Sequence, residues 1–134
     1  MTVFVDTAAW LALLNTRDAL HAPALRVMAG LQRQNALLTT TEFILIELAN
    51  ALSAPAFRVQ AAAFIEGLQT LTYARIVPAS AMLFADGMNL YRERPDKQWS
   101  LIDCTSFIVM REANITDAFS SDHHFEQAGF IKLL

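Results

Sequence analysis

Acidic residues are the most informative chemical groups in this sequence. Four of them follow a predicted strand or lie on a predicted apolar helix: Asp6, Glu47, Asp103 and Asp122. Two carboxylates about 4 Å apart repel by about 4 kcal/mol at an effective dielectric near 20, so such a cluster must take up protons or a cation. Ligation by carboxylate oxygens suits Mg²⁺ or Mn²⁺ and not zinc. Because these ions bind phosphodiesters and lower the pKa of a bound water, the set predicts metal-assisted phosphodiester hydrolysis.

Glu47 is the strongest single indication of function. It lies four residues from both Phe43 and Ala51 on a largely apolar predicted helix, with no Lys or Arg within one turn. Acids on a buried surface rarely lack a partner. We therefore interpret Glu47 as a functional residue and not as a tolerated surface residue.

The three aspartates also have structural interpretations. Asp6 and Asp122 each follow a predicted strand, where Asp is a good helix N-cap. Asp103 lies three residues after Ser100 and could complete a capping box. The helix that carries Asp103 is apolar nearly all round, which predicts burial, and a buried acid needs a partner. Both interpretations stay open for each aspartate.

Other site chemistries find little support. The four glycines are isolated, so the sequence has no phosphate-binding loop. An aspartyl-phosphate phosphatase similar to the haloacid dehalogenases would need a second Asp two residues after Asp6, where Ala8 stands. We interpret His123 and His124 as solvated residues of a short exposed turn, and His21 shows no partner.

A polar loop ahead of Asp103 carries the basic residues best placed to bind an anionic substrate, namely Arg92, Arg94 and Lys97. The formal net charge of −3 argues against a broad basic surface, so we expect any nucleic acid to be held by a local strip. A solvated loop is an equally good interpretation. Trp99, at the end of this loop, is interpreted as a packing residue that could also stack a base.

Composition limits the class of protein. The 134 residues suit one domain, residues 1–134, and 54% of them are hydrophobic. The apolar stretches are too short for a membrane span, and the first residues lack the basic segment of a signal peptide. Cys104 is the single cysteine, which excludes an intrachain disulfide and a thiolate zinc cluster. We therefore expect a cytoplasmic protein with no membrane association.

The expected elements alternate along the chain. Strands are predicted at 3–5, 36–39, 73–77, 117–120 and 130–133, and helices at 7–14, 19–34, 56–71, 80–92, 100–112 and 123–127. A further helix to residue 52 is predicted to begin at a capping box formed by Thr39 and Glu42. Alternation predicts a parallel sheet with helices on both faces. Sites in such sheets form beyond the carboxyl ends of the strands, which is where the acids lie.

The first two predicted helices carry more apolar residues than short peripheral helices need: Trp10, Leu11, Leu14, Leu25, Met28 and Leu31. We expect part of this surface to bind a partner, and ordinary core packing is the alternative for about half of these residues.

Four segments together resemble the PIN-domain nucleases, most closely the VapC-like proteins of bacterial toxin–antitoxin pairs: Val5–Thr7, Glu47–Leu52, Ser100–Cys104 and Ser120–Phe130. Each segment is short, but their order and spacing cover most of the chain. The Asp96–Lys97 pair resembles one subgroup of that family. The resemblance implies an α/β/α sandwich with a five-stranded parallel sheet.

The resemblance also implies Mg²⁺- or Mn²⁺-dependent endonuclease action on RNA. Asp6 and Asp103 match the principal metal ligands, and Glu47 and Asp122 complete the acidic set. Ser120 takes the place of a hydroxyl residue, often Thr, and is expected to bind substrate. A cognate antitoxin and a homodimer are the implied protein partners.

Three functions stay open at this point. The leading hypothesis is an RNA-cleaving toxin restrained by an antitoxin. The second is a housekeeping RNA-processing nuclease of the same fold. The third is a non-catalytic interaction protein whose acids hold a structural ion. The sequence does not identify the RNA target, and it assigns no role to Asp96.

Overall fold

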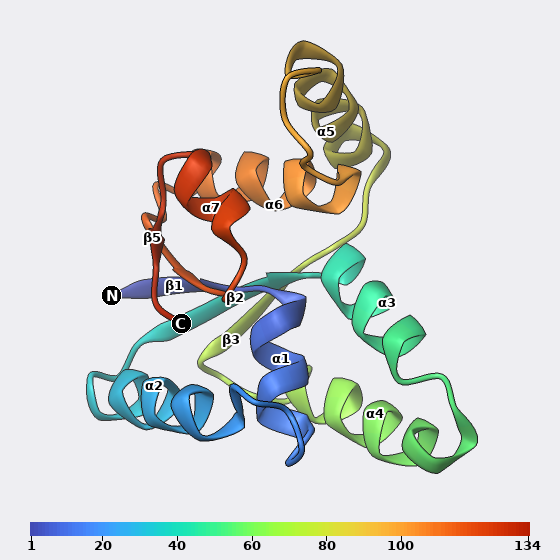
Figure 1. The fold of residues 1–134 in the computed structure, drawn as a ribbon, viewed down its shortest axis with the longest axis vertical. Helices are drawn as coiled ribbons and strands as arrows, with labels where there is room; N and C mark the ends of the chain where they lie inside the picture. The colour runs from blue at the N-terminus through green and yellow to red at the C-terminus, as the bar shows by residue number, and fades with distance from the viewer.

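A five-stranded parallel sheet forms the centre of the computed structural model, which describes residues 1–134 (Figure 1). The strand order is β3-β2-β1-β4-β5, and every neighbouring pair is parallel. The strands are β1 (Thr2–Val5), β2 (Leu37–Thr41), β3 (Ala74–Val77), β4 (Asp117–Phe119) and β5 (Ile131–Lys132). The predicted α/β class with a five-stranded parallel sheet is confirmed.

Helices cover both faces of this sheet. They are α1 (Thr7–Leu14), α2 (His21–Arg33), α3 (Glu42–Ala51), α4 (Pro55–Leu68), α5 (Ala81–Glu93), α6 (Leu101–Glu112) and α7 (His123–Gln127). In Figure 1, α6 and α7 lie above the sheet, and α1, α2 and α4 lie below it. Helix α5 packs against α6 and projects away from the sheet. No helix is long and apolar enough to cross a membrane.

The central strand β1 determines where a site can form. Val3, Phe4 and Val5 are fully buried, as expected of a strand covered on both faces. The chain passes from β1 to β2 and β3 on one side, then returns to add β4 and β5 on the other. The strand order therefore reverses between β1 and β4, and ligand sites of open α/β sheets form at such a point. Asp6 and Ser120 directly follow these two strands.

The start of α3 differs from the prediction. Strand β2 continues to Thr41, whose Oγ1 accepts a hydrogen bond from the backbone N–H of Ile44 at 3.0 Å and so caps α3. Glu42 does not pair with Thr39. Its Oε1 accepts a hydrogen bond from the backbone N–H of Ala79 at 2.8 Å, which ties α3 to the segment between β3 and α5. The predicted capping box is wrong because Thr39 pairs within the sheet.

The connection between α1 and α2 contains a second difference. Asp18 Oδ1 accepts a hydrogen bond from the backbone N–H of Leu20 at 2.8 Å, and α2 begins only at His21. His21 does have a partner, because its Nδ1 lies 2.7 Å from the carbonyl oxygen of Ala12. This contact joins the end of α1 to the start of α2.

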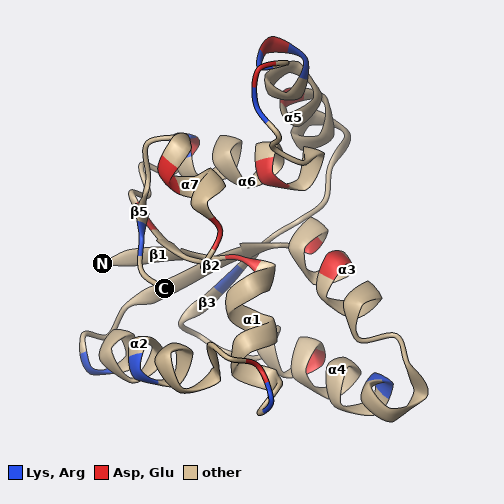
Figure 2. Cartoon of the chain, viewed as in Figure 1, with Lys and Arg blue, Asp and Glu red and all other residues tan.

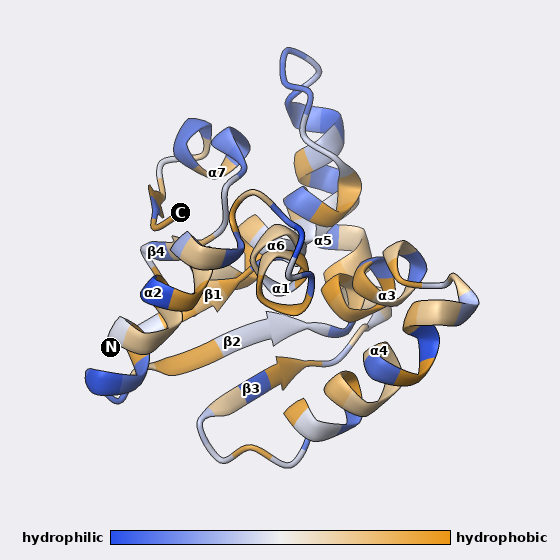
Figure 3. Cartoon of the chain, turned by 60° about the horizontal axis from the view of Figure 1, so that its bottom comes forward, coloured by the Kyte–Doolittle hydropathy of each residue, from blue (hydrophilic) through white to orange (hydrophobic).

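The apolar surface lies only partly where it was expected. Trp10 and Leu31 are core residues at 2% and 4% exposure, so the alternative of core packing holds for them, whereas Leu25 is exposed. The other exposed large apolar side chains include Ile46, Phe57 and Val59 on α3 and α4, and Met82, Phe84 and Tyr91 on α5. Figure 3 shows orange, hydrophobic segments between blue, hydrophilic ones on the adjacent helices α3 and α4.

Candidate active site

The four predicted acids come from four elements that meet near the carboxyl ends of β1 and β4 (Figure 2). Asp6 follows β1, Glu47 lies in the middle of α3, Asp103 lies in the first turn of α6, and Asp122 precedes α7. Asp6 and Asp103 are buried, and Glu47 and Asp122 are half-buried. Their only ion-pair partners are His123 and His124, and no Lys or Arg pairs with any of them.

Asp6 is the most perturbed of these groups. Its pKa rises to about 7, first because burial removes the carboxylate from water. Hydrogen bonds from Ser120 and from the backbone of Thr7 oppose this rise, and the negative charges of Asp103 and Glu47 add to it. Asp6 therefore lies within electrostatic reach of two other carboxylates. Although it occupies the N-cap position of α1, its side chain makes no capping hydrogen bond, so the structural interpretation does not account for it.

Asp103 completes a capping box and also contacts His124. Ser100 Oγ accepts a hydrogen bond from the Asp103 backbone N–H at 2.9 Å, and Asp103 Oδ2 accepts one from the Ser100 backbone N–H at 3.0 Å, which completes the capping box. The same Oδ2 lies 3.0 Å from His124 Nδ1. Both contacts use one carboxylate oxygen, so Oδ1 accepts no hydrogen bond from the protein.

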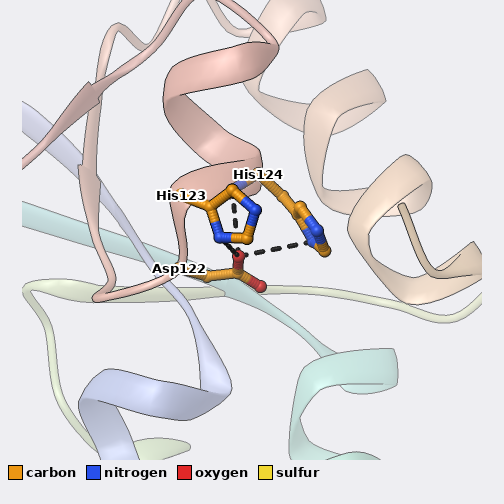
Figure 4. A group of neighbouring side chains, drawn as sticks. All are labelled: Asp122, His123 and His124. Atoms are coloured by element: carbon orange, nitrogen blue, oxygen red, sulfur yellow. Dashed lines mark hydrogen bonds and ion pairs between the residues drawn. The ribbon is translucent and has the colours of Figure 1, made fainter. Parts of the chain in front are cut away.

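Asp122 also uses only one of its two carboxylate oxygens for contacts within the protein. Its Oδ1 caps α7 by accepting a hydrogen bond from the backbone N–H of His124 at 2.9 Å. The same oxygen lies 3.3 Å from His124 Nδ1 and 3.6 Å from His123 Nδ1 (Figure 4). Oδ2 of Asp122 accepts no hydrogen bond from the protein. Asp103 and Asp122 thus each cap a helix with one carboxylate oxygen, and the other oxygen of each is able to bind a cation.

Ser120 connects the first and fourth acids. Its hydroxyl donates to Asp6 Oδ2 at 2.9 Å and accepts from the backbone N–H of Asp122 at 3.0 Å. The side chain is fully buried. This burial argues against the expected contact between Ser120 and substrate, and the two hydrogen bonds indicate that it positions Asp6 and Asp122 instead.

His124 is the site residue that the sequence interpretation missed. The prediction of two solvated imidazoles holds for His123, whose side chain is 69% exposed, but is wrong for His124, which is 16% exposed and contacts two acids. The only available signal was its position two residues after Asp122. The contact with Asp103 depends on how α6 and α7 pack.

The loop ahead of Asp103 is more strongly paired than expected. Arg94 forms two hydrogen bonds of 3.0 Å with Asp96, which gives Asp96 a structural role. Arg92 donates to Asn89 at 2.6 Å, whereas Lys97 forms no ion pair. Lys97 is therefore the cation of this loop that is least engaged with the protein.

Trp99 is a packing residue. It is 4% exposed, its ring packs edge-on against Phe107 at 5.0 Å between centroids, and its Nε1 donates to Gln127 Oε1 at 3.0 Å. The Arg94 guanidinium lies 5.1 Å from the centre of the Trp99 ring. The packing interpretation thus accounts for Trp99, and burial of its ring argues against base stacking.

The donor set fits a hard divalent cation. Carboxylates from four elements converge without a lysine or arginine to neutralise them, and oxygen ligands of this kind suit Mg²⁺ and Mn²⁺. Asp122, His123 and His124 form the one group of three potential ligands whose donor atoms lie within 4.8 Å of one another, and Asp6, Glu47 and Asp103 lie outside that group. Divalent metal binding is thus chemically compatible with this site.

Comparison with known proteins agrees with this geometry. The sequence matches the PIN domain family over residues 3–131. It is 30% identical over 131 residues to the 23S rRNA-specific endonuclease VapC20 of Mycobacterium tuberculosis, an alignment that covers 98% of this chain and 97% of that protein.

Two solved structures share the fold. The crystal structure of Mycobacterium tuberculosis VapC20, described as a sarcin–ricin loop cleaving toxin, matches with a TM-score of 0.85, 29% identity and 96% coverage of both chains. FitAcB from Neisseria gonorrhoeae matches with a TM-score of 0.65 and 16% identity, over 97% of this chain and 95% of that chain. The predicted resemblance is confirmed, and the chain belongs to the PIN-domain family.

Proposed function

We propose that this chain is a divalent-metal-dependent endoribonuclease and the toxin of a toxin–antitoxin pair. The observation that carries the proposal is the convergence of Asp6, Glu47, Asp103 and Asp122, without a lysine or arginine partner, at the switch point of a parallel sheet. The similarity to an RNA endonuclease over almost the whole chain supports the choice of substrate.

The four acids are the proposed metal ligands, with Mg²⁺ or Mn²⁺ as the ion. Such an ion, when bound, supplies a Lewis acid for the phosphodiester and an activated water as nucleophile. Asp103 offers Oδ1, because Oδ2 is held by Ser100 and His124, and Asp122 offers Oδ2. Ser120 holds the carboxylate of Asp6 through Oδ2. The chain's contribution is thus a set of carboxylates whose orientation is held before substrate binds.

Structured RNA is the proposed substrate class, because the relative is specific for 23S rRNA and is described as cleaving the sarcin–ricin loop. Arg92, Arg94 and Lys97 line a hollow beside the start of α6 and are the proposed phosphate contacts. Arg94 would have to exchange Asp96 for a phosphate, whereas Lys97 is free to bind directly.

A cognate antitoxin is the proposed protein partner, in the cytoplasm. An amphipathic helix could cover exposed apolar residues such as Leu25 and Ile46, and a basic side chain among the acids would compete with the cation. Hydrogen exchange on the complex tests this: protection should include α1 to α3 and the acids. Protection confined to α5 would contradict it, and the mass of the free protein in solution would test the proposed homodimer.

Metal-stimulated cleavage of RNA by purified protein is the direct test of function. We expect cleavage with Mg²⁺ or Mn²⁺, none in EDTA, and none from Asp103→Asn. Asp86→Asn makes the same chemical change on α5, outside the site, and should cleave normally. Metal should also stabilise the fold, by about 2.7 kcal/mol when its free concentration is 100-fold above its dissociation constant.

Each alternative predicts a different result. Metal binding without any RNA cleavage would favour a non-catalytic protein with a structural ion. Cleavage without growth arrest when the protein is expressed would favour a housekeeping nuclease. Undiminished cleavage in EDTA would refute the metal mechanism itself.

A further inference from the structure

His124 lies beside the acidic site, where α7 meets α6. It lies in the first turn of α7, and its backbone N–H is capped by Asp122. Its Nδ1 lies 3.0 Å from Oδ2 of Asp103 on α6 and 3.3 Å from Oδ1 of Asp122 (Figure 4 shows the Asp122 contact). The imidazole therefore bridges carboxylates that come from different elements.

We propose that His124 is a positioning residue that orients Asp103 and Asp122 toward the cation. Carboxylate oxygens only accept hydrogen bonds, so Nδ1 carries the hydrogen, and it does so in one neutral tautomer as well as in the charged ring. Oδ2 of Asp103 thus receives two donors, the Ser100 backbone N–H and His124 Nδ1–H. Turning this carboxylate would break both bonds, so Oδ1 stays free for the ion.

The inference rests on the proposed metal-dependent function and extends it to a residue that is not a ligand. Hydrogen-bonding groups behind metal ligands commonly contribute about 10- to 100-fold to metal affinity or activity. Helix α7 has only five residues, and Asp122 is its N-cap. The His124 contact fixes this short helix, and with it Asp122, against α6.

His123 provides a matched control within the chain. It is the same residue type, it directly precedes His124, and its Nδ1 lies 3.6 Å from Asp122. Its side chain is 69% exposed and does not contact Asp103. A general effect of removing an imidazole from this helix should therefore appear in His123→Gln and His123→Ala as well.

Replacements at His124 separate the hydrogen bond from the bulk of the ring. Asn places an N–H donor at the same number of bonds from the backbone as His Nδ1, whereas Gln places its donor one bond further out. We expect His124→Asn to bind Mn²⁺ nearly as tightly as the wild type. His124→Gln and His124→Ala should bind it about 10- to 100-fold more weakly. Binding is measured on the protein without RNA, by calorimetry and by the electron paramagnetic resonance of free Mn²⁺.

Two further measurements distinguish positioning from other roles. A positioning role weakens Mg²⁺ and Mn²⁺ alike, whereas a direct imidazole ligand would favour Mn²⁺, so a selective loss of Mn²⁺ would overturn the proposal. Thermal melting in EDTA reports folding, and the Asn and Gln variants keep the comparison valid where the Ala variant unfolds. Equal metal affinity in the Asn, Gln and wild-type proteins would also overturn it.

Failure of this inference is separable from failure of the proposed function. If Asp103→Asn loses metal binding while every His124 variant retains it, only the positioning role is wrong. If Asp103→Asn itself binds metal as the wild type does, the metal site and everything that rests on it are wrong.

Discussion

Replacing Asp6 by Asn should stabilise the metal-free protein above neutral pH. Burial raises the pKa of Asp6 from 3.8 to about 7, a rise of roughly three units. At 1.36 kcal/mol per unit, ionising this carboxyl in the folded state costs about 4 kcal/mol. The folded state binds the extra proton between these two pKa values, so the stability that depends on Asp6 falls as pH rises through this range. Asn is uncharged throughout, and its amide oxygen can still accept the hydrogen bond from Ser120.

Urea unfolding in EDTA measures this difference. At about pH 3 the two proteins should differ little, and at about pH 8 the Asn variant should be more stable by up to about 4 kcal/mol. Asp86→Asn controls for the loss of one negative charge. Added Mg²⁺ should then stabilise the wild type more than Asp6→Asn, because the cation offsets the cost of ionisation.

Parallel stabilities across pH would refute the reasoning, as would an Asp6→Asn protein that is less stable at about pH 8. Either result would mean that Asp6 is ionised at little cost in the free protein. Loss of stability together with retained RNA cleavage would further show that Asp6 serves the scaffold and not the site.

Gly87→Ala should destabilise the fold by about 1 to 3 kcal/mol in urea unfolding, because its Cβ would lie 2.6 Å from Thr105 Cγ2 where α5 packs on α6. Gly67→Ala, whose Cβ would contact nothing within 4 Å, should be neutral or stabilising, and equal costs would contradict this packing argument. Ser120→Ala should lower the free energy of unfolding by about 1 to 3 kcal/mol, and it should raise the pKa of Asp6 further because it removes a hydrogen-bond donor to that carboxylate. A carboxyl titration followed by NMR that shows no rise in this pKa would contradict the expectation. Neutralising Arg92, Arg94 and Lys97 together should weaken RNA binding. The slope of log affinity against log salt concentration should fall by somewhat under one for each phosphate contact that is lost, and an unchanged slope would mean that the RNA binds elsewhere.

The architecture was predictable because its signals are local. The run Val3 to Val5 is apolar without alternation, which is typical of a strand buried on both faces, and it lies at the centre of the sheet. The acids could be found for a related reason. Asp6 directly follows β1 and Asp122 comes three residues after β4, and parallel strands end at the same edge, so their proximity follows from the topology.

Features that depend on a choice between equivalent residues were not predictable in this way. Three threonines precede α3, and each has the right chemistry to cap it. Pairing of β2 with both of its neighbours engages Thr39 and leaves Thr41 as the cap. Likewise, periodicity does not tell a core residue such as Trp10 from a surface residue such as Leu25, because both lie on apolar helix faces.

Contacts between distant helices were the hardest to predict. His124 meets an acid 21 positions away in the sequence, and only the packing of α7 on α6 brings the two together. No local pattern around His124 carries that information. By contrast, the pair between Arg94 and Asp96 spans only two residues, and the sequence interpretation nevertheless left Asp96 without a role.

The hydrogen bond between Ser120 and Asp6 spans 114 positions of the chain. Contacts of such long range form slowly in folding, because much of the chain must be ordered before they can close. During synthesis, Asp6 leaves the ribosome early, but its carboxyl cannot bind Ser120 until β4 has been made and has paired with β1. A nascent chain that ends before Ser120 therefore has no assembled site, and translation that stops early yields fragments without the acid set. For the proposed ribonuclease, this order of assembly delays activity until β4 and the segment that carries Asp122 have been made.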